Sequence, residues 1–131
     1  MAAEAICIVA PTRFHNYTVA DGGAIPKGTV LKMTDPNTAA ASSADNDVFA
    51  GIAMEEKTAN DGVVTISAAL DGVWALTATA AGITVGNDVT IAGANTIKIY
   101  TTLDDEKGYV VGKALETTAG SETIMVRLKG Y

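Results

Sequence analysis

The sequence predicts an all-β protein built as a small barrel or sandwich. Thr, Val, Ala, Ile and Gly dominate its 131 residues, and the straight-chain residues that fill surface helices are scarce. Short apolar runs recur between clusters of Gly, Asn and Asp, which is the pattern of strands separated by turns. One hairpin-like stretch also occurs twice, and such repetition is typical of a scaffold rather than of a catalyst.

Nine short runs are the expected strands. Each is rich in β-branched or other apolar residues and is bounded by polar or Gly-containing turns. In chain order they are residues 6–9, 29–33, 49–54, 63–67, 73–78, 88–92, 96–101, 109–115 and 123–128.

The segments between these runs carry turn chemistry. Asn60-Asp61-Gly62 and Asp71-Gly72 supply positive-φ positions for tight hairpins, and Gly93-Ala94-Asn95 closes the strand pair around it. We expect the Ala-rich residues 38–44 and 77–82 to be surface loops, with a helical turn as the alternative, because Ser and β-branched neighbours oppose a helix.

An internal hairpin repeat spans residues of about 45–67 and 106–128. At one constant spacing the second copy repeats an apolar strand, a polar turn and a further apolar strand, so both copies are expected to face one core. Leu115 is expected in that core. A weaker similarity links residues 25–31 with 83–89. The matched residues are Gly51, Ala53, Met54, Glu55 and Val63 with Gly112, Ala114, Leu115, Glu116 and Ile124.

Residues 1–16 are expected to be an N-terminal arm or the first strand, followed by a single domain over residues 17–131. Pro11 interrupts the apolar segment, and no Gly-containing turn folds it back before residues 21–23. An extended segment with one apolar face is suited to adding a strand to the sheet edge of another protein. Both interpretations remain open and are compatible.

Composition argues against catalysis, nucleic-acid binding and membrane insertion. The chain has one His, one Cys and a net charge of −6, and its cationic residues are scattered. His15 and Cys7 form no nucleophile–base pair that strands would bring together, so we expect neither an enzyme nor a cofactor. The apolar residues 5–10 are too few to span a membrane, and residues 1–4 lack the basic start of a secretory signal.

Acidic and aromatic residues offer little more. The densest acidic groups are Asp45-Asn46-Asp47, which starts like a calcium loop but lacks its later ligands, and Asp104-Asp105-Glu106. Both are expected to be solvated loop acids, and no metal site is expected. Trp74 could be a stacking platform for a sugar or base. Without a neighbouring aromatic or basic partner, packing in the core or at a subunit interface is favoured.

Several motifs together resemble the capsid cement, or head-decoration, proteins of tailed bacteriophages. Their order and spacing match over about residues 20–129, and the segment at 38–47 and the Cys7 region have no strong counterpart. The motifs are residues 50–54, 63–66, 70–76, 83–89 and 111–116, with Val126-Arg127-Leu128 at the end.

The resemblance implies a small β-barrel or β-tulip domain that forms a homotrimer on the outer surface of a virion. There it would clamp adjacent major capsid protein subunits at three-fold and quasi-three-fold positions, after synthesis in the host cytoplasm. The candidate capsid-binding residues are Ile6, Ile8, Val9 and Phe14, with alternate side chains inserting into pockets of the capsid. The main alternative is a surface adhesin or glycan-binding β module, which would need several exposed aromatics or a calcium loop on one rim.

Overall fold

The computed structural model describes residues 4–45, 47–100 and 109–129, and within them the protein is all-β with no helix, which confirms the predicted class. These described ranges form eleven strands instead of the nine expected. They are β1 (Ile6–Val9), β2 (Phe14–Thr18), β3 (Val30–Asp35), β4 (Thr38–Ala41), β5 (Phe49–Ala53), β6 (Thr65–Ala69), β7 (Val73–Ala78), β8 (Asp88–Gly93), β9 (Thr96–Ile99), β10 (Val110–Ala114) and β11 (Thr123–Leu128).

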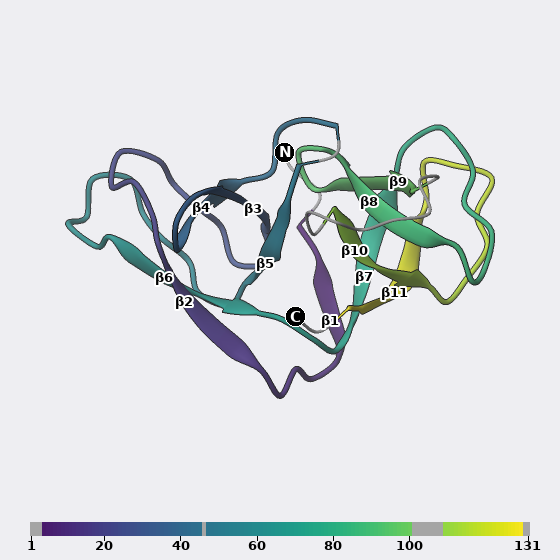
Figure 1. Ribbon diagram of the computed structural model, residues 1–131, viewed down its shortest axis with the longest axis horizontal. Coiled ribbons are helices and arrows are strands. Elements are labelled where there is room, and N and C mark those ends of the chain that lie inside the picture. Colours follow the sequence, from purple (N-terminus) through teal and green to yellow (C-terminus); the bar gives the residue numbers. More distant parts are fainter. Residues whose placement is uncertain (1–3, 46, 101–108, 130–131) are drawn as a thin grey trace.

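The strands form two lobes that lie side by side (Figure 1). Strands β2 to β6 make a closed barrel in the order β2-β4-β3-β5-β6, here called the first barrel. Strands β7 to β11 repeat that order, β7-β9-β8-β10-β11, and the pairing of β7 with β9 closes the second barrel. In each barrel the first and third strands pair in parallel, while every other neighbouring pair is antiparallel. Strand β1 extends the sheet of the second barrel beside β7.

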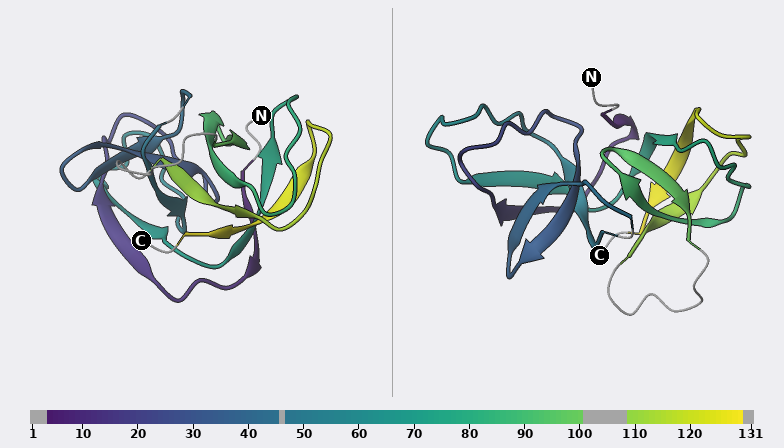
Figure 2. Two further views of the ribbon diagram at one scale, coloured as in Figure 1. Left: turned by 45° about the vertical axis from the view of Figure 1, so that its right-hand side comes forward. Right: turned by 90° about the horizontal axis from the view of Figure 1, so that it is seen from above.

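The repeat therefore covers an entire barrel rather than one hairpin. Gly28 and Gly86 both have a φ of 91°, and the turn residues Asn37 and Asn95 have φ values of 52° and 58°. Isolated bridges also recur at matching places, between Ile25 and Lys57 and between Ile83 and Thr118. Because topology, turns and bridges all repeat, the two barrels share one architecture. Seen from above, they form two lobes (Figure 2).

The predicted match between the two hairpins is confirmed at its start, at Ala53 and Ala114, and is wrong at its end, where Val63 does not correspond to Ile124. Ala53 and Ala114 are both buried, as expected. Val63, however, is 46% exposed, and Ile66 is the buried counterpart of Ile124. The reason is loop length: Glu55 accepts a hydrogen bond from the Ser67 amide 12 residues later, whereas Glu116 accepts one from Met125 nine residues later.

The expectation that Leu115 lies in the core is also wrong, because its side chain is 37% exposed. It follows Ala114, the last residue of β10. Side chains alternate between the two faces of a strand, so the residue after the buried Ala114 points to the opposite side.

The Ala-rich segment expected to be a surface loop contains β4, and Ala78 of the second Ala-rich segment ends β7. Alanine has little intrinsic preference for strands, but β4 lies between β2 and β3 in a closed barrel, where neighbouring strands supply its backbone partners. Ala39 is only 2% exposed, so a small side chain fits this interior. Strand β2 was missed because its sequence, FHNYT, is largely polar and mostly exposed.

The predicted positive-φ turn positions are confirmed at Asn60, Gly62 and Gly72, and a positive φ is also found at Asn95. Only the last of these closes a hairpin, between β8 and β9. Residues 60–62 lie in the long connection between β5 and β6, and Gly72 lies in the link from β6 to β7, which belong to different barrels. The expectation of tight hairpins at those two places is therefore wrong.

Two hydrophobic clusters fill the molecule. One cluster lies inside the first barrel and includes Tyr17, Leu31 and Ile66. The other fills the second barrel and continues onto the outer face of the first, where it takes in Val30, Phe49, Ile52 and Ala69. In β5, residues that face this second cluster alternate with residues that face the interior of the first barrel. All five positions of β5 are therefore buried, and the strand lies between two cores.

Gly112 in β10 marks the closest approach of two strands. A Cβ atom there would lie 2.0 Å from the Arg127 carbonyl oxygen and 2.9 Å from the Leu128 Cα, both of which are backbone atoms of β11. Neither atom can move aside without breaking the β10–β11 pairing at Gly112 and Leu128.

We predict that Gly112→Ala lowers the free energy of unfolding by about 3 kcal/mol or more, because the added methyl group forces two paired strands apart. Gly93→Ala is the matched control, since its Cβ would meet only the Thr96 hydroxyl at 3.3 Å, and its cost should stay below about 1 kcal/mol. Urea unfolding followed by circular dichroism measures both. Equal effects of the two substitutions would contradict the close approach.

Candidate interaction surface

Strand β1 presents a row of exposed apolar side chains. Ile6, Ile8 and Val9 are 62%, 51% and 54% exposed, although the strand pairs along β7 with a bulge between Cys7 and Val9. Phe14, at the start of β2, is 52% exposed. The structure thus places all four candidate capsid-binding residues at the surface, on two consecutive strands that belong to different sheets. We call these four residues the apolar N-terminal surface.

This segment is held in place at both ends. The Ala5 amide donates to the Gly28 carbonyl at 2.8 Å, and Ala5 is buried. After β1, the Asp71 carboxylate accepts hydrogen bonds from the Thr12 amide and hydroxyl, both at 2.7 Å, and from the Arg13 amide at 3.2 Å. The Thr12 hydroxyl, foremost among these donors, holds the pKa of Asp71 below its usual value. Residues 6–9 are therefore a strand of the sheet, tied to both barrels.

Trp74 belongs to the interior. It is 3% exposed within the cluster of the second barrel, and its indole Nε1 donates to the Asp71 carbonyl at 3.1 Å. A buried indole with a satisfied N–H group has no free face for a sugar or base.

His15 and Cys7 are not brought together. His15 Nε2 lies 2.5 Å from the Asn37 Oδ1, and its ring packs edge-on against Tyr17. Cys7 is exposed, with its thiol directed to the Val9 carbonyl. Across the described ranges no group of three His, Cys, Asp or Glu residues could hold a metal ion, and none of the described segments is a helix able to cross a membrane.

The acidic loop at residues 45–47 is structural where it is described. The Asp47 carboxylate accepts hydrogen bonds from the Ser43 and Ala44 amides at 2.9 Å each. Asp45 forms an ion pair with Lys98 at 2.7 Å, which joins the first barrel to the second. Asn46 and the acidic residues 104–106 lie outside the described residues.

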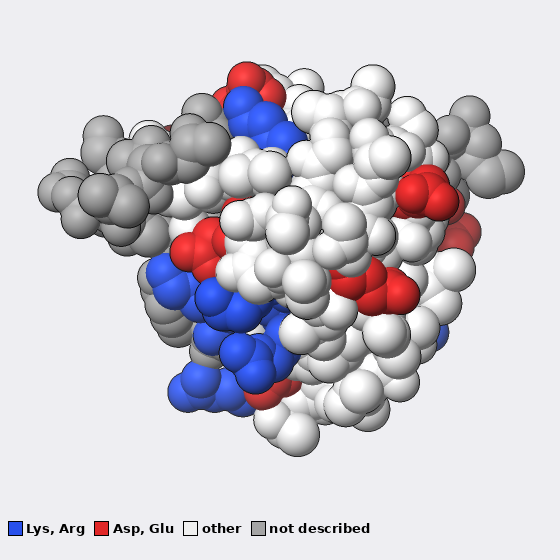
Figure 3. Space-filling view, turned by 90° about the vertical axis from the view of Figure 1, so that its right-hand side faces the viewer, with Lys and Arg blue, Asp and Glu red and all other residues white. Residues whose placement is uncertain are grey.

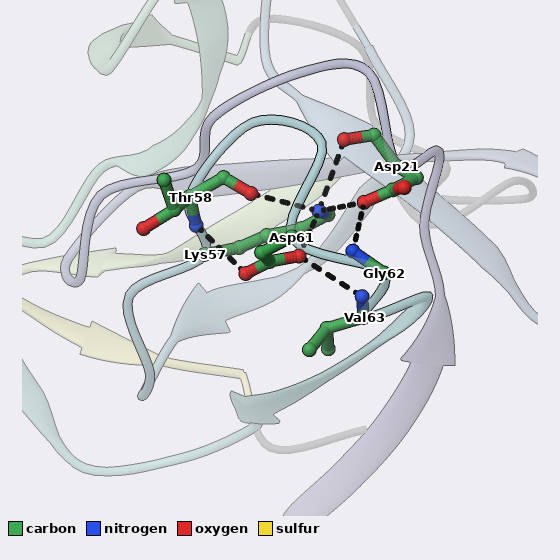
Figure 4. A network of polar contacts seen from close by, with 6 residues as sticks. All are labelled: Asp21, Lys57, Thr58, Asp61, Gly62 and Val63. Carbon is green, nitrogen blue, oxygen red and sulfur yellow. Dashed lines mark hydrogen bonds and ion pairs between the residues drawn. The ribbon is translucent and has the colours of Figure 1, made fainter.

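A buried lysine organises the far end of the first barrel (Figure 4). The Lys57 side chain is 2% exposed, and its ammonium group donates to Asp21 Oδ1 and Asp61 Oδ1, each at 2.9 Å, and to the carbonyls of Asp21 and Thr58, each at 3.1 Å. The carboxylates in turn accept backbone amides, including that of Val63. Because every donor of the Lys57 ammonium group has an acceptor, this cluster is a structural clamp that joins two loops.

The same contacts set the protonation of the clamp. Burial alone would lower the pKa of Lys57, but the hydrogen bonds to Asp61 and Asp21 outweigh it and raise that pKa. The hydrogen bond from Lys57 is the largest cause that lowers the pKa of Asp61 from 3.8 to about 2. Because the pKa of Asp61 is lower in the folded than in the unfolded protein, its ionised carboxylate stabilises the fold at pH values above the unfolded-state pKa. That contribution is lost as the pH falls through the folded-state pKa.

We predict that wild-type protein loses stability between about pH 4 and pH 2 in part through Asp61, and that Asp61→Asn shows a smaller loss over that range. The variant should also be less stable at pH 6, because Lys57 loses an ionic partner. Glu56→Gln, at an exposed position of the same loop, serves as control. Denaturant unfolding at a series of pH values provides the measurement, and parallel curves for wild type and Asp61→Asn would refute the clamp's role.

A basic groove lies on the second barrel and was missed by sequence reasoning. It has a volume of about 230 Å³ and is lined by Lys113, Arg127 and Lys129, with Asp88 at its side. Lys and Arg side chains gather on one side of this end of the molecule, although the chain carries a net charge of −6 (Figure 3). Lys113 lies directly opposite Arg127 in the β10–β11 pair. One signal in the sequence could have located this groove. Lys113 and Arg127 each interrupt the apolar residues of a strand in the second copy of the hairpin repeat.

Comparison with known proteins identifies the fold. No family model and no curated protein sequence matches the chain. Among solved structures, the head fiber gp8.5 N base of bacteriophage phi29 is similar, with a TM-score of 0.56 over 89% of this chain and 93% of that chain at 13% sequence identity. The chain therefore has the fold seen in that phage protein domain.

Proposed function

We propose that the protein is a structural component of a bacteriophage virion that binds the outer surface of the capsid and stabilises it by clamping adjacent major capsid protein subunits. The observation that carries this proposal is the likeness to a head fiber base, which extends over nearly the whole of both chains. The resemblance of the sequence motifs to capsid cement proteins is a second, independent reason for the same conclusion.

The chemistry of the surface supports a binding role rather than a catalytic one. His15 contacts Asn37 and Tyr17, the exposed Cys7 thiol is directed to the Val9 carbonyl, and in the described part of the chain no buried side-chain nitrogen or oxygen lacks a hydrogen-bond partner. We therefore propose a protein without enzymatic activity or cofactor, whose partners are the major capsid protein and further copies of itself, most simply as a homotrimer. Nucleic acid and membrane are not partners in this proposal.

The capsid would contact the apolar N-terminal surface. Ile6, Ile8 and Val9 together form an uncharged strand on an otherwise acidic chain, and an exposed apolar edge strand is a site where another chain adds or packs. The anchors at Ala5 and Asp71 fix this strand before binding, which reduces the entropy lost on association. Several such contacts in one oligomer would add avidity on a regular lattice.

An adhesin or glycan-binding module is the alternative, since it would use a similar all-β frame. Its best candidate, Trp74, is buried. Of the Phe, Tyr and Trp side chains in the described residues, Phe14 is the exposed one and is left as the candidate glycan contact, so a glycan array is the direct test of this alternative.

We predict that Ile8→Asp weakens binding to undecorated capsids of the cognate phage by tenfold or more, equivalent to about 1.4 kcal/mol per site. The charge would have to enter an apolar contact, whereas the fold should persist because Ile8 is 51% exposed. Cosedimentation with capsids measures the affinity.

Val85→Asp is the matched control, because Val85 is 56% exposed in the loop between β7 and β8 of the second barrel. It should bind capsids like wild type. If Ile8→Asp binds as well as Val85→Asp while both melt like wild type, the apolar N-terminal surface is not the capsid contact.

A further inference from the structure

The two barrels of one chain already contain a docking interface. The turn between β8 and β9 of the second barrel rests on the first barrel, where the Asn95 Oδ1 accepts a hydrogen bond from the Val30 amide at 2.8 Å. The Asn95 amide donates to the Ser42 hydroxyl at 3.0 Å, and Asn95 is 3% exposed. A turn of one barrel thus fits against a sheet face of its neighbour.

The receiving face is a row of three apolar residues across β3, β5 and β6. Val30 pairs with Ile52, and Ile52 pairs with Ala69, and all three are fully buried. The strand registers give the same row on the second barrel, because Asp88 pairs with Lys113, and Lys113 pairs with Arg127. The docking face of the second barrel is therefore the basic groove, exposed and charged where the first barrel is covered and apolar.

The turn has a counterpart as well. Asp35-Pro36-Asn37 connects β3 to β4 in the first barrel as Gly93-Ala94-Asn95 connects β8 to β9 in the second. Asn37 has the same left-handed backbone as Asn95, but residues 35–37 are exposed and Asp35 adds a carboxylate at the place of Gly93. We call residues 35–37 the acidic turn.

We propose that the acidic turn of one copy of the protein docks in the basic groove of a second copy, at the place that corresponds to the seat of the β8–β9 turn on the first barrel. The Asn37 side-chain oxygen faces His15, so the Asp35 carboxylate makes the contact in place of the asparagine amide. The occupant of the groove is then a second copy of this chain, with the Asp35 carboxylate facing Lys113 and Arg127. This inference rests on the proposed function in one respect: self-association is proposed there, and the two surfaces that would make it are named here.

Charge supports this assignment. Lys113 and Arg127 are directly opposite in an antiparallel pair, where like charges destabilise the sheet. The ion pair of Lys113 with Asp88 is long, at 3.5 Å, and both side chains are about half exposed. A second carboxylate entering the groove relieves the repulsion between the two cations. Each chain has a net charge of −6, so two copies carry like charges overall. At this contact, by contrast, a carboxylate of one copy meets cations of the other, and charges of opposite sign face each other.

The geometry of such a contact determines the kind of assembly. Each copy offers an acidic turn on its first barrel and a basic groove on its second, so the contact is head-to-tail. Head-to-tail contacts close into rings when the rotation between copies permits it. In such a ring, the barrel-to-barrel contacts between chains would use the same faces of the barrel as the contact within each chain.

Disulfide trapping between two differently tagged variants tests the contact, with Cys7 replaced by Ser in both. One variant carries Pro36→Cys and the other Lys129→Cys, so that Asp35, Lys113 and Arg127 are kept, and all three substituted positions are exposed. Mixed in purified form without capsids under mild oxidation, they should form the mixed dimer at least tenfold faster than a mixture in which Glu56→Cys replaces Pro36→Cys. The rate advantage should fall as salt is raised, because the attraction is ionic.

Charge exchange gives a second measurement on the wild-type cysteine background. Asp35→Lys alone and Lys113→Glu alone should each abolish self-association in sedimentation velocity, and the double variant should restore it. No rate advantage over the Glu56→Cys control, preferential formation of either homodimer, or no rescue in the double variant would each overturn the proposed contact. None of these results bears on the Ile8→Asp capsid assay, so the capsid-binding proposal stands or fails separately.

Discussion

Burial of β5 on both faces is the constraint on which the rest of the structure depends. A five-stranded barrel of this length has a small interior, and small cores stabilise a domain only marginally. The protein obtains more buried apolar area by covering the outer face of its first barrel with its second, so that Phe49 and Ile52 face one core while Ala50 and Ala53 face the other. The Asn95 turn and the Asp45–Lys98 ion pair fix the angle of this packing.

Equivalent faces of the two barrels carry different residues, so a repeated scaffold presents distinct surfaces. The row at Val30, Ile52 and Ala69 is apolar where the second barrel covers it, and its counterpart is charged where nothing within the described chain covers it. Strand β1 makes a further difference, because it occupies the edge of β7 and carries exposed apolar side chains. The functional proposals therefore attach to the places where the two barrels differ.

The sequence was sufficient for the fold class, for most strands and for the beginning of the repeat, because these depend on local pattern and turn chemistry. It did not reveal β2 or β4, whose polar or Ala-rich sequences become strands through partners distant in the chain. Leu115 was assigned to the core because apolar character does not indicate which face of a strand is covered. The basic groove was missed for a related reason: Lys113 and Arg127 are separated in sequence and meet only through the register of β10 and β11.

The central claim is that the two barrels are one cooperative unit because they share a core through β5. Native-state hydrogen exchange measures this most directly, through the opening free energies of interior amides in each barrel, such as those of Leu31 and Ile66 in the first and Ile91 and Val126 in the second. The account predicts that the slowest amides of both barrels exchange with the same free energy and the same denaturant dependence, equal to those of global unfolding. Two separate plateaus, with one barrel opening while the other stays closed, would contradict it.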